Sequence, residues 1–226
     1  MNYVIGTSPR SGSTLLCSLL RSSGVAGWPQ SWFRVENREE FAVEWGVDAA
    51  DRAAFLAGAL AAGRRGSDGF ALRMMWGTMA EVESWLGPGL ADVAPVHWVR
   101  LERRDKVAQA VSRHRAEASG IWHLGIEEAA VPGVPVYDFG AIEAYRAAAE
   151  ADAAEWLGWF GARGLVPLRV YYEDLAADPV GEAGRVLAAL GLPVAVMAAG
   201  TVRMAGEESA DWALLFRREA GLSLRA

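Results

Sequence analysis

A short turn near the amino terminus contains the residue types that bind phosphate-like anions. The apolar run at residues 3–5 ends at Gly6, and the turn at residues 7–12 (TSPRSG) leads into leucines at helical spacing. A helix that begins there offers free backbone N–H groups and a partial positive charge to an anion. The hydroxyl of Ser11 or Ser13 is expected to cap this helix. The stretch therefore predicts an anion cradle, although a plain strand-turn-helix with a serine-rich turn would show the same pattern.

The turn differs from a Walker A loop, because it lacks the Gly-Lys-Ser/Thr end of that motif. Gly12 is followed by Ser13 and Thr14, and the nearby cation is Arg10, which precedes Gly12. An arginine in this place suits a group that carries a terminal anion next to a 5′-phosphate. No bound Mg²⁺ is needed for such a group, so no metal is expected.

Composition places the chain among globular proteins. It has 226 residues, of which 52% are hydrophobic and 22% charged, enough for one domain with a full core. A net charge of −6 argues against general binding to nucleic acid. Residues 53–63, the longest nearly uncharged helical run, are too short to span a bilayer, and no basic segment leads into an apolar one at the start. A cytoplasmic location is expected, with the single cysteine, Cys17, in the core.

Strands and helices are expected to alternate along the chain. The apolar runs predict strands at residues 3–5, 70–76, 96–101 and 165–171. Helices are predicted after Gly12, from about residue 105 to 118, and over residues 48–64, 78–86, 139–160, 179–190 and 210–219. This alternation predicts a single α/β domain, residues 1–226, with a mainly parallel central sheet flanked by helices. Ligands of such sheets bind beyond the carboxyl ends of the strands.

Two charged positions lie close to the predicted strand ends. Arg103 follows the third strand, and Ser112 lies nine residues later on the next helix, so the pair could close on one phosphate. Arg73 is an unexpected charge within a buried strand, where an unpaired cation is costly. It either reaches a pocket at the strand end or pairs with a carboxylate. His97, inside the third strand, is expected to be a hydrogen-bonded core residue rather than a catalyst.

Three further stretches have a less certain role. Trp28, Trp32 and Phe33 follow the first helix and either line an acceptor pocket or anchor their loop to the core. Residues 34–40 are strongly charged, and most are expected to be solvated. Residues 123–138 contain Pro and Gly without clear periodicity and are a candidate lid or acceptor loop.

Several of these segments together resemble bacterial sulfotransferases, most of all the trehalose 2-sulfotransferase family. Residues 9–16 (PRSGSTLL) resemble the phosphosulfate loop of that family, and residues 103–112 resemble its 3′-phosphate segment. The remaining matches are to its acceptor loop, a strand end with arginine for lysine, and segments nearer the carboxyl terminus: residues 24–30, 73–76, 115–122, 172–179 and 203–218.

The resemblance implies a P-loop-NTPase-like sulfotransferase fold and a donor, 3′-phosphoadenosine 5′-phosphosulfate, whose sulfuryl group passes to a hydroxyl of a carbohydrate, lipid or other small acceptor. It implies that Arg10 and the loop N–H groups stabilise charge on the bridging oxygen, and that the protein forms a homodimer. The residues implied to bind the 5′-phosphosulfate are Pro9, Arg10, Ser11, Gly12, Ser13 and Thr14. Those implied to bind the 3′-phosphate are Arg103, Ser112 and Arg203. Those implied at the acceptor are Gln30, Ser31, Trp32, Phe33, Arg73 and Trp122.

One position departs from the family pattern. The family has a glutamate as general base after Pro-Gln, where this chain has Ser31. Because a serine of normal pKa is a poor base, a nearby carboxylate is expected to substitute. Glu36 is the nearest in sequence, and Glu39 and Glu40 are the alternatives. Two other functions stay open: a kinase-like phosphoryl transferase that binds Mg·ATP, and a non-catalytic nucleotide-binding protein.

Overall fold

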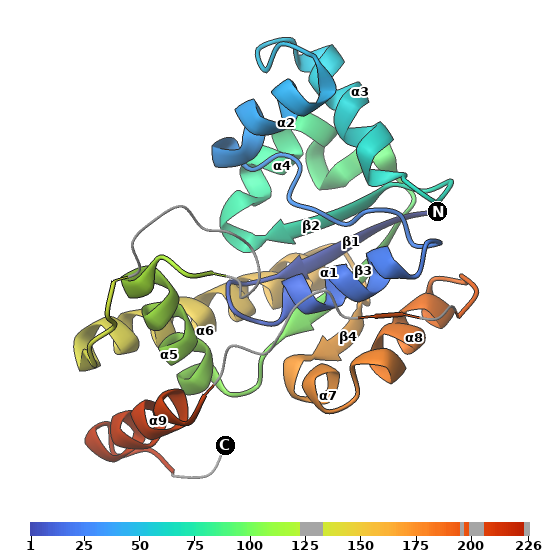
Figure 1. Cartoon of the computed structure of the whole chain (residues 1–226). Coiled ribbons are helices and arrows are strands. Elements are labelled where there is room, and N and C mark those ends of the chain that lie inside the picture. Colours follow the sequence, from blue (N-terminus) through green and yellow to red (C-terminus); the bar gives the residue numbers. More distant parts are fainter. Residues whose placement is uncertain (123–132, 195–196, 199–205, 224–226) are drawn as a thin grey trace.

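A four-stranded parallel sheet forms the centre of the molecule (Figure 1). The computed structural model describes residues 1–122, 133–194, 197–198 and 206–223. The strands are β1 (Asn2–Thr7), β2 (Ala71–Met75), β3 (Val96–Glu102) and β4 (Leu168–Tyr171), in the order β2-β1-β3-β4. Each neighbouring pair is parallel, which confirms the predicted α/β fold.

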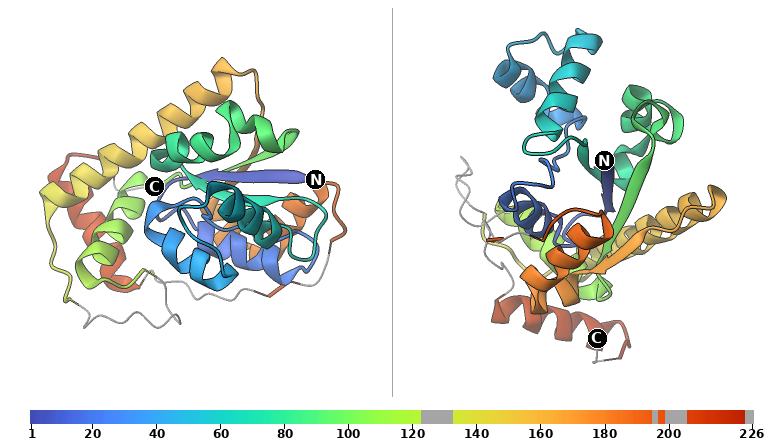
Figure 2. Two further views of the ribbon diagram at one scale, coloured as in Figure 1. Left: turned by 90° about the horizontal axis from the view of Figure 1, so that it is seen from above. Right: turned by 90° about the vertical axis from the view of Figure 1, so that its right-hand side faces the viewer.

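Helices cover both faces of the sheet, as the two further views in Figure 2 show. Because side chains alternate along a strand, Tyr3 and Ile5 of β1 belong to one hydrophobic cluster and Val4 to another. The first cluster lies under α1 (Ser13–Ser22) and α8 (Pro179–Ala189).

The second cluster lies under the carboxyl-terminal half of α6 (Phe139–Ala162) and under α4 (Met79–Leu86). In it, the buried Trp156 of α6 donates a hydrogen bond of 3.0 Å to the carbonyl of Thr7. This bond fixes the end of β1, where the turn that is predicted to bind an anion begins.

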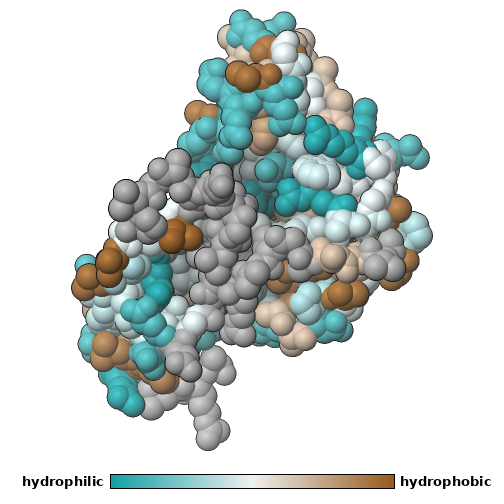
Figure 3. All heavy atoms as spheres, viewed as in Figure 1, coloured by the Kyte–Doolittle hydropathy of each residue, from teal (hydrophilic) through white to brown (hydrophobic). Residues whose placement is uncertain are grey.

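A helical lobe stands beside β2 and consists of α2 (Arg38–Trp45), α3 (Arg52–Gly63) and α4. Its buried side chains include Phe41, Phe55 and Trp85. Short 3₁₀ turns, η1 (Val35–Asn37), η2 (Trp76–Thr78) and η3 (Pro88–Val93), flank these helices. Sequence analysis missed α2, because its charged outer residues read as a solvated loop. Hydrophilic side chains cover much of this lobe in Figure 3.

A third hydrophobic cluster lies beyond the carboxyl ends of the strands. It joins α5 (Lys106–Ser119), α9 (Glu207–Glu219) and the first half of α6 through Val111, Ile142 and Phe216. The short helix α7 (Tyr172–Ala177) follows β4 directly and was also missed. These elements surround the end of the sheet at which the sequence predicts a ligand.

Two local predictions are wrong, and one is confirmed. Neither Ser11 nor Ser13 caps α1: Gly12 occupies the N-cap position with φ 85°, and the Ser11 hydroxyl instead donates to the carbonyl of Ser8 at 2.6 Å. His97 is exposed near the start of β3 and is not a core residue. Cys17 is fully buried, as expected. None of the helices in the described ranges is long and apolar enough to cross a membrane.

Candidate active site

The turn between β1 and α1 is shaped by backbone conformation and held from behind by α5. Arg10 and Gly12 both have positive φ, 63° and 85°. Gln109 of α5 donates hydrogen bonds from Nε2 to the carbonyl of Pro9 at 2.7 Å and to Ser8 Oγ at 3.0 Å. The first N–H groups of α1 have no intrahelical partner and open onto this turn. The turn is therefore a rigid cradle with donors available to an anion.

Arg10 joins this cradle to α5. Its Nε donates a hydrogen bond of 3.0 Å to Ser112 Oγ, 102 residues away in the sequence. Its Nη1 donates a bond of 2.6 Å to the carbonyl of Trp122. The two segments that the sequence predicted to bind phosphate, the turn and the Arg103–Ser112 region, are thus side by side.

Arg103 approaches the same cradle from the end of β3. Its guanidinium carbon lies 4.4 Å from the ring centroid of Tyr172, a cation–π contact. The ring of Tyr172 in turn occupies the space beside Gly12, where an added Cβ would lie 2.6 Å from Cδ2. The Tyr172 ring therefore contacts both Arg103 and the turn, and it leaves room only for a glycine at position 12.

A pocket of about 850 Å³ opens between the turn, α5, α7 and α9. Its volume is in the range that holds a drug-sized or nucleotide-sized ligand. The positively charged residues that line it are Arg10, Arg103, Arg115 and Arg217. Apolar parts of the wall come from Ile121, Pro135, Ala213 and Leu214.

The two carboxylates of the pocket are already engaged by the protein. Glu173 accepts hydrogen bonds of 3.1 Å from the backbone N–H groups of Arg104 and Asp105. Asp105 accepts a bond of 2.6 Å from Arg217 Nη2. Among the residues that the structure describes, the pocket thus has four cations and two carboxylates, and the carboxylates are satisfied by protein donors, an arrangement suited to an anionic ligand.

On the opposite side of α1, a second cation reaches the cradle from β2. Arg73 donates hydrogen bonds from Nε to Ser31 Oγ at 3.0 Å and from Nη1 to Thr14 Oγ1 at 3.4 Å. Ser31 Oγ donates to the carbonyl of Arg73 at 3.2 Å. Gln30, the preceding residue, forms a parallel bridge to Leu72. Arg73 therefore bonds to two hydroxyl groups at the strand end; it does not line the pocket of about 850 Å³, and among the described residues it pairs with no carboxylate.

The comparisons with known proteins agree with this geometry. The family described as Stf0 sulphotransferase matches residues 2–219. The chain belongs to the Stf0 sulphotransferase family. The protein is therefore a sulfotransferase, the enzyme class that the sequence predicted.

Similar proteins occur in two mycobacteria. Trehalose 2-sulfotransferases of Mycobacterium tuberculosis and Mycolicibacterium smegmatis are 29% and 28% identical to this Stf0 sulphotransferase, over 96% of this chain and 95% of theirs. Among solved structures, a sulfotransferase from Alicyclobacillus acidocaldarius has a TM-score of 0.48 at 14% identity, over 99% of this chain and 96% of that one. A sulfotransferase domain from the curacin biosynthetic pathway also has 0.48, at 20% identity, over 85% of this chain and 74% of that one.

The aromatic residues near the acceptor loop of this Stf0 protein are core residues. Trp32 and Phe33 are 2% and 0% exposed, and Trp32 Nε1 donates to the carbonyl of Ala71 at 3.1 Å. Of the two alternatives stated for these rings, the structure shows the one in which they anchor the loop. Their side chains do not line a site, because the lobe encloses them. The carbonyl of Trp122, by contrast, faces Arg10.

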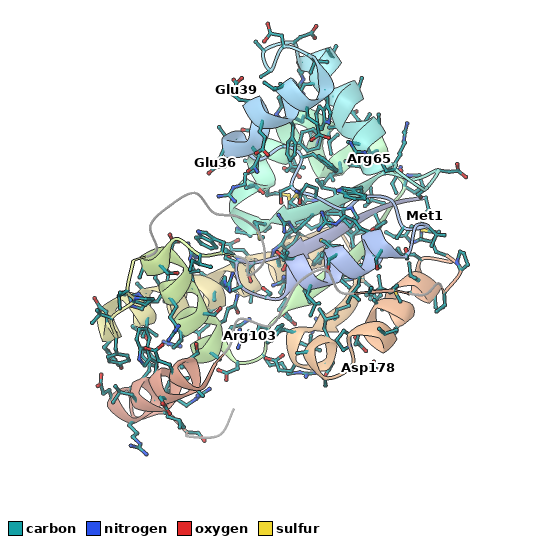
Figure 4. The ribbon with its side chains drawn as sticks, viewed as in Figure 1. Met1, Glu36, Glu39, Arg65, Arg103 and Asp178 are labelled. Carbon is teal, nitrogen blue, oxygen red and sulfur yellow. The ribbon has the colours of Figure 1, made fainter. Side chains whose placement is uncertain are left out.

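Glu36 lies apart from the cation cluster. Figure 4 shows Glu36 beside α2, whereas Arg103 lies well away from it, just before the start of α5. Its side chain is 66% exposed, and its carboxylate accepts a hydrogen bond of 2.9 Å from Arg34 Nε. Its own backbone N–H and the Arg34 guanidinium hold the pKa of Glu36 below its usual value. A carboxylate so stabilised is a weakened base.

Some of the predicted residues cannot be placed. Arg203 and residues 123–132 of the candidate lid lie outside the described residues. Of the remaining part of that segment, Gly133 and Pro135 line the pocket. Within the described ranges, no group of three His, Cys, Asp or Glu residues could hold a metal ion.

Three pocket residues were predicted only as members of segments that resemble the family's cofactor-binding segments. Asp105, Arg115 and Arg217 all line the pocket. They stood within the segments that resemble the family, but only their convergence in space marks them as a group. The signal that could have found them is the clustering of arginines near the predicted strand ends.

Proposed function

We propose that this chain transfers a sulfuryl group from 3′-phosphoadenosine 5′-phosphosulfate to a hydroxyl of a small acceptor, with carbohydrates as the first acceptor class. The observation that carries the proposal is the hydrogen bond between Arg10 and Ser112. This bond joins the turn that we propose for the 5′-phosphosulfate to the segment that we propose for the 3′-phosphate, and Arg10, Arg103 and Ser112 line one pocket. A nucleotide with anions at both positions is the ligand that such a pair of sites fits.

The donor's two anions would bind at different walls of the pocket. The backbone N–H groups of residues 11–14 would hold the 5′-phosphosulfate, aided by the positive end of α1. Arg103 and Ser112 would hold the 3′-phosphate, since a guanidinium offers bidentate geometry to phosphate oxygens. Arg203 stays a prediction for this side of the nucleotide.

The reaction requires positioning and charge stabilisation more than covalent chemistry. The acceptor oxygen forms a bond to sulfur while the bond from sulfur to the bridging oxygen breaks. The electron pair of that bond stays on the 5′-phosphate, and the proton of the acceptor hydroxyl passes to a base or to water. The products are a sulfate ester and 3′,5′-adenosine bisphosphate. Fixed N–H donors of the turn stabilise the charge that grows on the leaving phosphate.

The carbohydrate acceptor is proposed from the relatives named above, whose names state trehalose. The chain differs from the family's pattern at Ser31, whose hydroxyl is bonded to Arg73 on both its donor and acceptor sides. This serine is therefore occupied in holding Arg73. That bonding is compatible with an acceptor different from trehalose, so a panel of sugars is needed.

Thermal unfolding with 3′,5′-adenosine bisphosphate tests the donor site. At about a hundred times its dissociation constant a ligand adds about 2.7 kcal/mol of stability, which in a domain of this size raises Tm by about 5–10 °C. We expect this shift for the wild type and its loss in Arg103→Ala. The matched control is Arg104→Ala, because Arg104 is the next residue but is paired with Asp174 outside the pocket.

Two results would contradict the proposal. A Tm shift with Mg·ATP alone would favour the kinase-like alternative. Equal shifts in Arg103→Ala and Arg104→Ala would place the bisphosphate elsewhere.

A further inference from the structure

Two adjacent arginines after β3 have different surroundings. Arg103 is buried and lines the pocket, whereas Arg104 is exposed and does not line it. Both follow the same strand, so their spacing alone does not decide which of them reaches a ligand. The contacts that distinguish the two arginines come from the end of β4 and the start of α7.

The side chains of both arginines lie against this segment. The guanidinium carbon of Arg103 lies 4.4 Å from the ring centroid of Tyr172. Arg104 donates hydrogen bonds from Nη1 and Nη2 to the two carboxylate oxygens of Asp174, at 2.8 and 2.7 Å. The guanidinium carbon of Arg104 also lies 3.9 Å from the ring centroid of Tyr171. Arg104 is therefore held outside the pocket, whereas Arg103 stays within it.

Glu173, which lies between Tyr172 and Asp174 in the sequence, binds the backbone that follows the pocket arginine. Its Oε2 accepts a hydrogen bond of 3.1 Å from the backbone N–H of Arg104, and its Oε1 accepts one of 3.1 Å from that of Asp105. Both N–H groups lie just ahead of α5, so the helix supplies no acceptor for them. The carboxylate is thus bonded twice, close to the positive end of the α5 dipole.

The peptide group between Arg103 and Arg104 is bound at both of its polar atoms. Its carbonyl, that of Arg103, accepts a hydrogen bond of 2.6 Å from Lys106 Nζ. Its N–H, that of Arg104, is the one that Glu173 binds. These two bonds restrain rotation of the peptide group, and with it the direction in which the Arg103 side chain leaves the backbone. Such restraint favours binding, because less conformational freedom is lost when a ligand arrives.

Glu173 would be an unfavourable pocket residue if it acted through its charge alone. It lines the pocket together with Arg103, and its carboxylate repels an anionic ligand. Its bonds to the backbone, by contrast, hold the cation that would attract that ligand. The two effects predict opposite results when the carboxylate is removed, so an experiment can separate them.

We propose that Glu173 sets the preference of the donor site for a 3′-phosphate by positioning Arg103. The inference rests on the donor proposed above. Glu173 is a positioning residue, because it acts through the backbone of residues 103–105 rather than on the ligand. Asp174, the next residue, is given no such role, since its bonds are to the exposed side chain of Arg104.

Two nucleotides that differ only in the 3′-phosphate test this role: adenosine 3′,5′-bisphosphate and adenosine 5′-monophosphate. Their dissociation constants are measured by titration calorimetry for the wild type, Glu173→Gln, Arg103→Ala and the double variant. The glutamine keeps one acceptor oxygen, but its amide nitrogen cannot accept the second N–H. The matched control is Asp174→Asn, which removes a carboxylate of the same helix from outside the pocket.

In Glu173→Gln we expect the affinity for the bisphosphate to fall about tenfold, and that for the monophosphate to stay within about twofold. In the Arg103→Ala background, Glu173→Gln should cause no further loss, because its effect passes through Arg103. Asp174→Asn should keep both affinities within about twofold, since its ion pair is exposed. Glu173→Asp keeps the charge but is one methylene shorter. It should also lose affinity for the bisphosphate, and it keeps the test open should Glu173→Gln fail to fold.

Binding of the bisphosphate by Glu173→Gln as tightly as by the wild type, or more tightly, would overturn the inference, because the carboxylate would then act only by repulsion. So would equal losses for both nucleotides, or a further loss in the Arg103→Ala background. In these cases the wild type would still prefer the bisphosphate, and the proposed donor site would stand. A wild type without that preference would overturn the proposed 3′-phosphate site and this inference together.

Discussion

Arg217 of α9 donates a hydrogen bond of 2.6 Å to Oδ2 of Asp105, the residue that caps α5. The other oxygen of Asp105 accepts from the backbone N–H of Ala108 at 2.9 Å. The backbone N–H of Asp105 donates to Glu173 of α7. One aspartate thus joins α5, α7 and α9, the three helices that surround the pocket.

Asp105→Ala should destabilise the protein by about 2–4 kcal/mol, because it removes a helix cap and leaves the buried Arg217 unpaired. The matched control is Asp51→Ala, which removes a similar cap on α3, a bond of 3.0 Å to Ala54, without an arginine partner. The Asp51→Ala variant should lose only about 1 kcal/mol of stability. Chemical denaturation checks both, and equal losses would contradict the coupling between Asp105 and Arg217.

Gly12→Ala should abolish binding of the bisphosphate. The added Cβ would lie 2.6 Å from the Tyr172 ring, in addition to the strain of a left-handed φ of 85°. The control is Gly24→Ala, whose φ is 72° but whose Cβ would meet nothing within 4 Å. It should cost about 1–2 kcal/mol of stability from strain alone and keep nucleotide binding. Calorimetric titration distinguishes them, and a Gly12→Ala variant of normal affinity would show that Tyr172 does not shape the turn.

The turn and its neighbours show how far the sequence could predict this site. Alternating apolar runs predicted the four strands and the order of the longer helices, because periodicity reflects which face is buried. The placement of Arg103 after a strand and Ser112 on the following helix followed from the same pattern, and both line the pocket. Helix α2 was missed because its charged outer residues read as a solvated loop, and α7 because six residues give too little periodicity.

The finer contacts of the site depended on information that spacing does not contain. The sequence could not decide whether Trp32 and Phe33 face a ligand or the core, because that depends on how the helical lobe packs over them. Nor could it show that Arg10 and Arg73 bond to different elements. Those contacts are set by side-chain conformations and by partners far away in the chain, such as Ser112.

Glu36→Gln should retain turnover within about twofold, since the structure gives this carboxylate no contact with the cradle and lowers its pKa. Loss of a general base typically costs about 10²–10⁴ in rate. Steady-state rates with an identified acceptor compare Glu36→Gln with Glu39→Gln and Glu40→Gln. A hundredfold fall confined to Glu36→Gln would restore that residue as the base.

Cys17 should resist thiol reagents in the folded protein. Burial raises the pKa of its thiol, an effect that the cations of Arg73 and Arg21 only partly oppose, so little thiolate forms. An unfolded chain loses the Cys17 thiol proton once the pH rises above about 8.5. The folded protein retains this proton at the same pH, because its thiol pKa is raised. Stability should therefore fall as pH rises beyond that value, and less so in Cys17→Ala. Labelling at pH 8 checks the first point, and native labelling at the rate of the unfolded chain would contradict it.

The central claim is that this chain is a sulfotransferase whose donor is 3′-phosphoadenosine 5′-phosphosulfate. The most direct measurement is transfer of ³⁵S from the labelled donor to a panel of sugars that includes trehalose, with wild type, Arg103→Ala and Arg104→Ala. We predict a labelled sulfate ester, formed together with equal amounts of the bisphosphate, in the wild type and Arg104→Ala, and a strong loss in Arg103→Ala. Tight binding of the donor without transfer to any hydroxyl acceptor, or transfer that is unchanged in Arg103→Ala, would contradict the account.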